Sequence, residues 1–447
     1  KIAHTMLHSR QLSSKFVTPI SSLLRRNYAS VVASPIVTKS KTGVSVVSVE
    51  DNAPASSVSL FVKAGSRAES TDNVGVAHFL KNFAFKNTKG KTAFRLTREA
   101  EFLGGILSAN LTRESLILSG EFLREDLSYF LEALSDVIFK TKYEPYEFDY
   151  VKKSVSFDSG AAEAIPEVLA LNAAHSVAFR HGLGNSLFAN ATTKVKDVDQ
   201  IIAFANKVYT ASNITVIGTS VNHKELVSLT DRFFEGVNHA VPTTPIPSKY
   251  FGGESRIAAT GESHFVLGFE GAPAGTPDYS ILQVLRAHLS GETHIKWGDG
   301  VTPLAQTANR LKDVQIGSFN AGYSDAGLFG LYMSGEPTSV YAAARAVAEQ
   351  LKHTAHGISK EDFRRAINKV KYHTAVSYDT RASKTELYGG QVLHSGKIIP
   401  VSDALFEFDH ITDEDVKNMA QKVLQCKPTT VALGDINTLP YADTISL

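Results

Sequence analysis

The sequence predicts a protein of the α+β class, built from two homologous domains. Three observations predict it: a long-range internal repeat, a Pro- and Gly-rich joint near the middle of the chain, and strands and helices that occur in groups. The chain has 447 residues, of which 43% are hydrophobic, so it can bury a substantial core. We therefore expect a globular protein with two comparable halves.

The repeat consists of three pairs of segments that occur in the same order in both halves, at an offset of about 212 to 215 residues. The pairs are a hairpin at 108–118 and 320–330, a helix at 198–209 and 413–424, and a closing strand at 215–218 and 430–434. Chance similarity accounts for one such pair. Several pairs at nearly one offset indicate two copies of one structural unit.

Hydrophobic periodicity assigns the other elements. In the first half we expect strands at 44–49 and 57–62, a helix at 74–85, two strands between 106 and 121, and helices at 127–139 and 147–157. In the second half we expect a strand at 264–269, a helix at 278–289, strands at 317–333, and helices at 339–351 and 361–378. Ser359 with Asp362, and Thr412 with Asp415, have the spacing of a capping box and predict two helix starts.

The joint between the halves reads V-P-T-T-P-I-P at 241–247 and is followed by Gly252 and Gly253. Proline removes backbone donors and disfavours helix, and glycine loosens the chain. We therefore divide the chain into a leader at 1–28, a first domain at 29–240, a linker at 241–255 and a second domain at 256–447.

The leader has the composition of a mitochondrial presequence. The first 49 residues contain no Asp or Glu, yet they include several basic residues and many Ser and Thr. The segment R-N-Y-A-S at 26–30 is typical of a matrix processing site, with cleavage expected near Tyr28. The alternative is a basic tail that binds an anionic partner.

Composition excludes several classes of function. The net charge of +1 gives no overall attraction to nucleic acid or to an anionic membrane. No apolar run approaches the roughly 18 residues that cross a bilayer. Cys426 is the one cysteine, so the sequence has no Cys cluster for iron–sulfur and no C-x-x-C-H for haem.

The motif with the most chemical content is H-F-L-K-N at 78–82, which resembles the inverted zinc-protease motif H-x-x-E-H. In that motif two imidazoles bind zinc and the glutamate takes a proton from the metal-bound water. Here His78 remains, Lys81 stands at the position of the base, and Asn82 replaces the second imidazole. The distal carboxylate ligand is expected about 75 to 80 residues downstream, at Asp158 or, in another register, Glu163. We therefore predict degenerate positions, with no catalysis, no metal and no other cofactor.

Three further motifs do not support a site. K-G-K-T at 89–92 resembles the end of a P-loop, but Phe85 occupies the position of the required glycine. The segment G-Y-S-D-A-G at 322–327 misses the nucleophile-elbow spacing by one residue, so we expect Ser324 on a hairpin. The loop at 290–300 binds an extended peptide or another subunit, or is an ordinary connection.

The broken motif at 78–82, the paired halves and the leader together resemble the family of mitochondrial processing peptidases and core proteins. The resemblance covers nearly the whole chain after the leader, and the hairpin at 318–332 is its most specific part. It implies two metalloprotease-like α+β domains, each with a mixed sheet packed with helices.

For a core-protein member, the resemblance implies a non-catalytic subunit of ubiquinol-cytochrome c reductase, respiratory complex III. Such a subunit lies on the matrix side of the mitochondrial inner membrane, pairs with core protein 1, and supports the cytochrome b and cytochrome c1 region. A processing-peptidase β subunit is disfavoured because it needs the intact metal site. The alternative is a non-catalytic, peptide-binding α-type subunit, whose glycine-rich loop the segment at 290–300 matches poorly.

Overall fold

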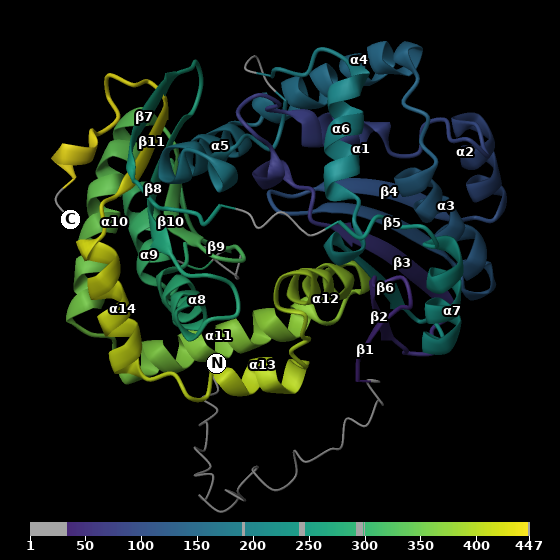
Figure 1. The fold of residues 1–447 in the computed structure, drawn as a ribbon. Helices are drawn as coiled ribbons and strands as arrows, with labels where there is room; N and C mark the ends of the chain where they lie inside the picture. Colours follow the sequence, from purple (N-terminus) through teal and green to yellow (C-terminus); the bar gives the residue numbers. More distant parts are fainter. Residues whose placement is uncertain (1–33, 190–192, 241–245, 292–297, 299, 446–447) are drawn as a thin grey trace, which may run out of the picture.

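A computed structural model describes residues 34–189, 193–240, 246–291, 298 and 300–445 (Figure 1). The predicted leader and most of the loop at 290–300 lie outside these residues. In the first half the elements are β1 (Ile36–Lys39), β2 (Ser45–Val49), β3 (Ala55–Val62), α1 (Val76–Phe83), α2 (Ala93–Phe102), β4 (Ile106–Leu111), β5 (Leu116–Leu123), α3 (Leu127–Phe139), α4 (Pro145–Glu163), α5 (Pro166–Phe179), α6 (Val198–Val208), β6 (Ile214–Thr219) and α7 (His223–Phe233).

In the second half the elements are β7 (Gly253–Ala258), β8 (Ser263–Gly271), α8 (Pro277–Leu289), α9 (Pro303–Leu311), β9 (Val314–Gly322), β10 (Gly327–Gly335), α10 (Pro337–His356), α11 (Lys360–Ser377), α12 (Arg381–Ser395), α13 (Val401–Glu407), α14 (Asp413–Gln425) and β11 (Thr429–Gly434). Helix α14 begins with the predicted capping box, in which Thr412 and Asp415 bond each other's backbone N–H groups. Strand β7 begins at Gly253, inside the predicted linker.

The two halves share the topology of a five-stranded sheet, to which the first half adds the edge strand β1. The first sheet has the order β1-β2-β6-β3-β5-β4 and the second the order β7-β11-β8-β10-β9. In each, one neighbouring pair is parallel, β2 with β6 and β7 with β11, and the other pairs are antiparallel. Ser108 and Asn320 lie on the equivalent edge strands β4 and β9, and Val216 and Val431 on β6 and β11. The α+β class and the repeat are therefore confirmed.

Each sheet buries one face under helices of its own half. In the first sheet, Leu60 and Val216 pack with residues of α1, α3, α4 and α6. In the second, Leu267 and Leu331 pack with residues of α8, α10 and α14. The alternation of apolar residues along each strand leaves a second apolar face on the other side.

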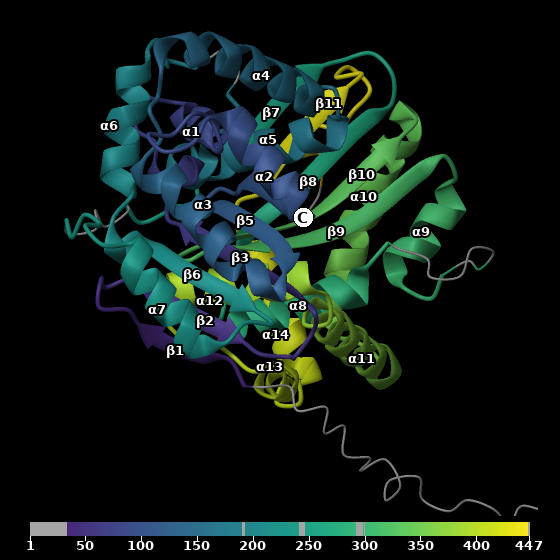
Figure 2. The same ribbon diagram turned by 90° about the vertical axis from the view of Figure 1, so that its right-hand side faces the viewer.

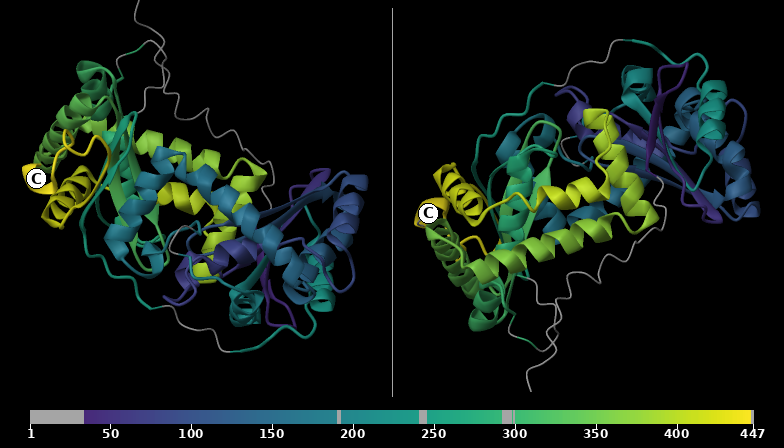
Figure 3. Two further views of the ribbon diagram at one scale, coloured as in Figure 1. Left: turned by 90° about the horizontal axis from the view of Figure 1, so that it is seen from above. Right: turned by 90° about the horizontal axis from the view of Figure 1, so that it is seen from below.

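The second face of each sheet is covered by a helix from the other half, so the halves exchange one helix each (Figures 1 and 3). Val392 and Leu393 of α12 pack on Phe61 and Ile217 of the first sheet. In return, α5 of the first half packs on the second sheet, through residues including Ala170, Ala174, Ala178 and Phe179. The exchange fixes the halves against each other.

Among the described residues, no helix combines the length and the apolar character that crossing a bilayer requires.

Candidate functional site

Helix α1 carries the degenerate motif, and its start is tightly built. Gly75 precedes the helix at φ 91°, and a Cβ there would lie 2.8 Å from Thr193 Oγ1, so glycine is required. The Glu69 carboxylate accepts from the N–H groups of Gly75 and Ala77, each at 2.9 Å. Burial raises the pKa of Glu69 to about 7, against these two hydrogen bonds, which lower it.

The structure brings four of the predicted positions together where α1 packs against α4: His78, Lys81, Asn82 and Asp158, here called the α1–α4 cluster. Asp158 Oδ2 lies 3.2 Å from Lys81 Nζ, 3.4 Å from Asn82 Nδ2 and 3.5 Å from His78 Nε2. Partial burial raises the pKa of Asp158, but the hydrogen bond and charge of Lys81, with Asn82, outweigh it and hold the pKa below its usual value. Glu163, the other candidate, is an exposed residue at the end of α4.

His78 is a buried and neutral side chain. Its Nδ1 accepts from the N–H of Ala189 at 3.1 Å, so the proton of the neutral ring is on Nε2, on the side of Asp158. Burial, and then the charge of Lys81, lower the pKa of His78 to about 4. The imidazole therefore remains uncharged at neutral pH.

These residues do not fit a catalytic zinc ion. Catalytic zinc typically needs three protein ligands and an open coordination position. Here the positive charge of Lys81 repels a dication, and Lys81 already pairs with Asp158. An Asn82 amide is a poor zinc ligand, and it bonds to the His78 carbonyl and Asp158. Within the described part of the chain, no three His, Cys, Asp or Glu residues group as metal ligands.

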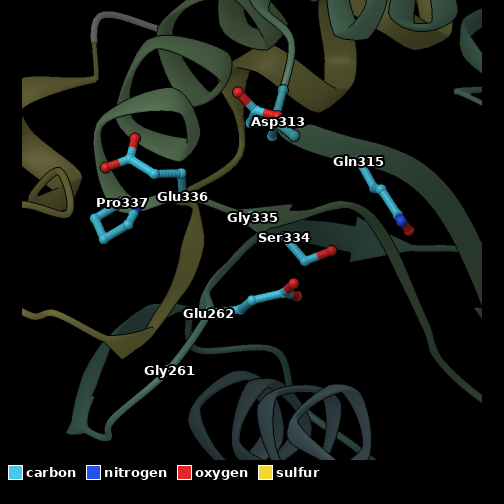
Figure 4. A pocket seen from close by; sticks show the side chains of 9 residues that line it. Gly261, Glu262, Asp313, Gln315, Ser334, Gly335, Glu336 and Pro337 are labelled. Carbon is cyan, nitrogen blue, oxygen red and sulfur yellow. The ribbon is translucent and has the colours of Figure 1, made fainter.

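The second half contains a hollow of about 600 Å³ between the β7–β8 turn and the start of α10 (Figure 4). Carboxylates of Glu262, Asp313 and Glu336 line it, with the polar side chains of Gln315 and Ser334. Glu336 accepts from the N–H groups of Thr338 and Ser339 and so caps α10. No residue of the α1–α4 cluster lines this hollow.

A second charge cluster, which sequence reasoning missed, joins the two halves. It consists of Arg67, Glu114, Ser324, Asp325 and His394, here called the seam cluster. Arg67 Nη1 lies 2.6 Å from Glu114 Oε1, and Nη2 of the same guanidinium pairs with Asp325. His394 Nε2 lies 3.4 Å from Glu114 Oε2. The turn between β4 and β5 thus meets the turn between β9 and β10, which are equivalent positions of the repeat.

Ser324 is a structural member of the seam cluster. Its hydroxyl donates to Glu114 Oε1 at 2.6 Å and accepts from Arg67 Nη1 at 2.8 Å, and its N–H donates to Glu114 Oε2 at 3.0 Å. The residue lies between β9 and β10, so the predicted hairpin is confirmed. The sequence signal that could have predicted the seam cluster was the presence of charged residues at equivalent turns of the repeat.

Next to the seam cluster, two buried side chains and the partly buried Tyr323 continue the contact between the halves. Tyr323 and His175 are joined by a 2.7 Å hydrogen bond between Oη and Nε2. The Arg113 guanidinium donates to the carbonyls of Leu183 and Asn185 at 3.0 and 2.6 Å. Burial, and then the charge of Arg113, lower the pKa of His175 to about 3.

Comparison with known proteins agrees with this architecture. Residues 45–191 match the family model described as Insulinase (Peptidase family M16), and residues 197–370 match the Peptidase M16 inactive domain. The protein named "Cytochrome b-c1 complex subunit 2, mitochondrial" from Cryptococcus neoformans is 37% identical over 96% of this chain and 96% of its own length. The protein of the same name from Neurospora crassa is 36% identical over 95% and 94%, and that from Homo sapiens 30% over 91% and 91%.

Proposed function

We propose that this chain is a non-catalytic structural subunit of ubiquinol-cytochrome c reductase, in the role of core protein 2. The chain belongs to the M16 peptidase family and to its branch of cytochrome b-c1 complex subunit 2 proteins. The observation that carries the proposal is the ammonium group of Lys81, 3.2 Å from the Asp158 carboxylate. This ammonium group neutralises the carboxylate that the resemblance assigns as a metal ligand. Lys81 itself stands at the position of the general base on α1. His78, Lys81, Asn82 and Asp158 are then remnants of a zinc site.

The proposed role depends on rigid surfaces instead of a reaction centre. Two exchanged helices and the nearly buried Arg67–Glu114 pair of the seam cluster hold the halves in one arrangement. Such a body can support neighbouring subunits, since obligate interfaces bury roughly 2,000 Å² or more. Losing the subunit would leave that surface exposed on its partners.

For location, we propose the matrix side of the mitochondrial inner membrane, with core protein 1 as the direct partner and cytochrome b and cytochrome c1 nearby. The acid-free basic leader at 1–28 supports mitochondrial import.

The division into domains at 29–240 and 256–447, joined by a linker, is part of the same proposal. The equivalent order of strands in the two sheets supports it.

Co-purification tests the proposed function. If the proposal is correct, the chain extracted from mitochondrial membranes fractionates with b- and c-type haem absorbance. Depleting it should lower cytochrome b and ubiquinol oxidation while presequence cleavage continues. Recovery in a soluble zinc-dependent heterodimer, with precursors accumulating on depletion, would replace the proposal with the α-type processing-peptidase subunit.

A further inference from the structure

The outer face of α4 carries an apolar stripe that the described residues of this chain leave exposed. Tyr146, Tyr150 and Phe157 are 63%, 73% and 77% exposed. The opposite face of α4 is already occupied, because Val151 and Val155 are buried in the core of the first half. Figure 2 shows α4 along the upper edge of the first half, on the outside of the molecule.

The spacing of this stripe is that of a helix–helix seam. Positions 146, 150, 153, 157, 160 and 164 follow one another at intervals of four and three residues, which places them on one side of the helix. The first four positions hold Tyr, Tyr, Lys and Phe, and the last two hold the exposed small residues Gly160 and Ala164. Small residues at one end allow a second helix to approach the α4 backbone closely.

The first aromatic ring of the stripe is held in place. Asn87 Nδ2 donates to Tyr146 Oη at 2.7 Å, and Asn87 Oδ1 accepts from the N–H of Ala93 at 2.8 Å. The ring is thus tied to the start of α2 as well as to α4. A side chain that is ordered before binding loses less entropy when a partner covers it.

Charge indicates what kind of partner fits. Lys153 lies in the middle of the stripe, is exposed, and pairs with no carboxylate among the described residues. A partner helix with an acidic residue opposite Lys153 satisfies this charge, and the aromatic neighbours exclude water from the pair. The three exposed aromatic side chains offer about 400 Å², roughly half of what one partner contributes to a standard interface.

We infer that the α4 stripe is a docking surface for an amphipathic helix of another protein subunit, with an acidic residue facing Lys153. The inference rests on the proposed function, because it takes this neighbour to be a subunit of the same complex. A protein helix is favoured over a membrane surface because the stripe is narrow and contains one lysine, and the chain as a whole carries a net charge of only +1.

The experiment compares two variants in the assembled complex. Tyr150→Ser combined with Phe157→Ser should lower the amount of chain that stays with the complex through purification by about tenfold, as expected when two interface aromatic residues are truncated. Tyr372→Ser on α11, the equivalent helix of the second half, is the matched control because Tyr372 is 66% exposed. The control should be retained like the native chain, and all isolated chains should melt alike.

A photo-crosslinking residue at position 157 of the otherwise native chain gives a second measurement that does not depend on the folding of the double variant. Cross-links to an acidic helix of a neighbouring subunit support the inference. Attachment to lipid alone, or retention of the double variant equal to that of the control, overturns it. A native chain that does not fractionate with the haem-containing complex refutes the proposed function instead.

Discussion

The central ion pairs of the two charge clusters differ in burial, and that difference indicates where charge matters for the structure. In the α1–α4 cluster, the side chains of Lys81 and Asp158 are 26% and 33% exposed. In the seam cluster, those of Arg67 and Glu114 are 7% and 11% exposed. Partly exposed pairs contribute about 0–1 kcal/mol, whereas breaking a buried pair costs roughly 3–5 kcal/mol. The Lys81–Asp158 pair is thus expected to contribute little to stability, and the Arg67–Glu114 pair much.

The largest expected effect comes from Glu114→Ala. The substitution leaves the buried guanidinium of Arg67 without one of its two carboxylates, so the free energy of unfolding should fall by about 3–5 kcal/mol. Denaturant unfolding followed by circular dichroism measures it. Glu132→Ala breaks the more exposed ion pair between Glu132 and Lys91, so it should lower the free energy of unfolding by under about 1 kcal/mol. Equal losses in the two variants would contradict the comparison.

Acid should destabilise the protein through His78 of the α1–α4 cluster and through His175 beside the seam cluster. Burial lowers the pKa of His78 to about 4 and that of His175 to about 3, below the unfolded value of roughly 6.5. Between these values the unfolded chain binds protons that the folded chain does not, so stability present above pH 6.5 is lost as the pH falls. From pH 7 to pH 5 the loss should be about 2 kcal/mol for each histidine.

Unfolding measured at both pH values tests this. His78→Gln and His175→Gln should each remove part of the pH dependence. A pH dependence that is the same in both variants as in the native chain would show that these imidazoles are charged in the folded state.

A pair of adjacent glycines tests the exchanged helix α12. A Cβ at Gly389 would lie 2.3 Å from the ring of buried Phe61, whereas one at Gly390 meets nothing within 4 Å. Gly389→Ala should therefore destabilise by about 1–3 kcal/mol, and Gly390→Ala should stabilise by up to about 1 kcal/mol. Thermal melting of the two variants gives the comparison. If Gly389→Ala melts like Gly390→Ala, α12 does not pack on the first sheet as described.

The smallest effect on stability, under about 1 kcal/mol, is expected for Lys81→Glu combined with Asn82→His. The pure native chain should hold no stoichiometric zinc. The double variant should gain zinc, because a His78 Nε2–Asp158 Oδ2 distance of 3.5 Å suits two ligands of one tetrahedral ion with bond lengths of about 2.1 Å. Elemental analysis measures both, and adding Asp158→Ala should remove the gain. About one zinc per native chain would refute the degenerate site.

The sequence was sufficient for the elements that have strong local signals. The helix expected at 127–139 coincides with α3, and the capping box at Thr412 and Asp415 begins α14. Among the site residues, the motif identified His78, Lys81 and Asn82 because i, i+3 and i+4 positions share a helix face. Asp158 and Glu163 stayed alternatives, because only the packing of α4 on α1 decides which carboxylate reaches His78.

By itself, then, the sequence determined the α+β class, the internal repeat and the loss of the protease residue types. Only the tertiary structure decided which surfaces meet. Periodicity shows that a helix or strand has an apolar face, but not what covers that face, so the exchange of α5 and α12 had no local signal. The charged turns of the repeat did not show that the seam cluster forms either, because Arg67 and Asp325 are 258 positions apart and become partners only when the two halves pack together.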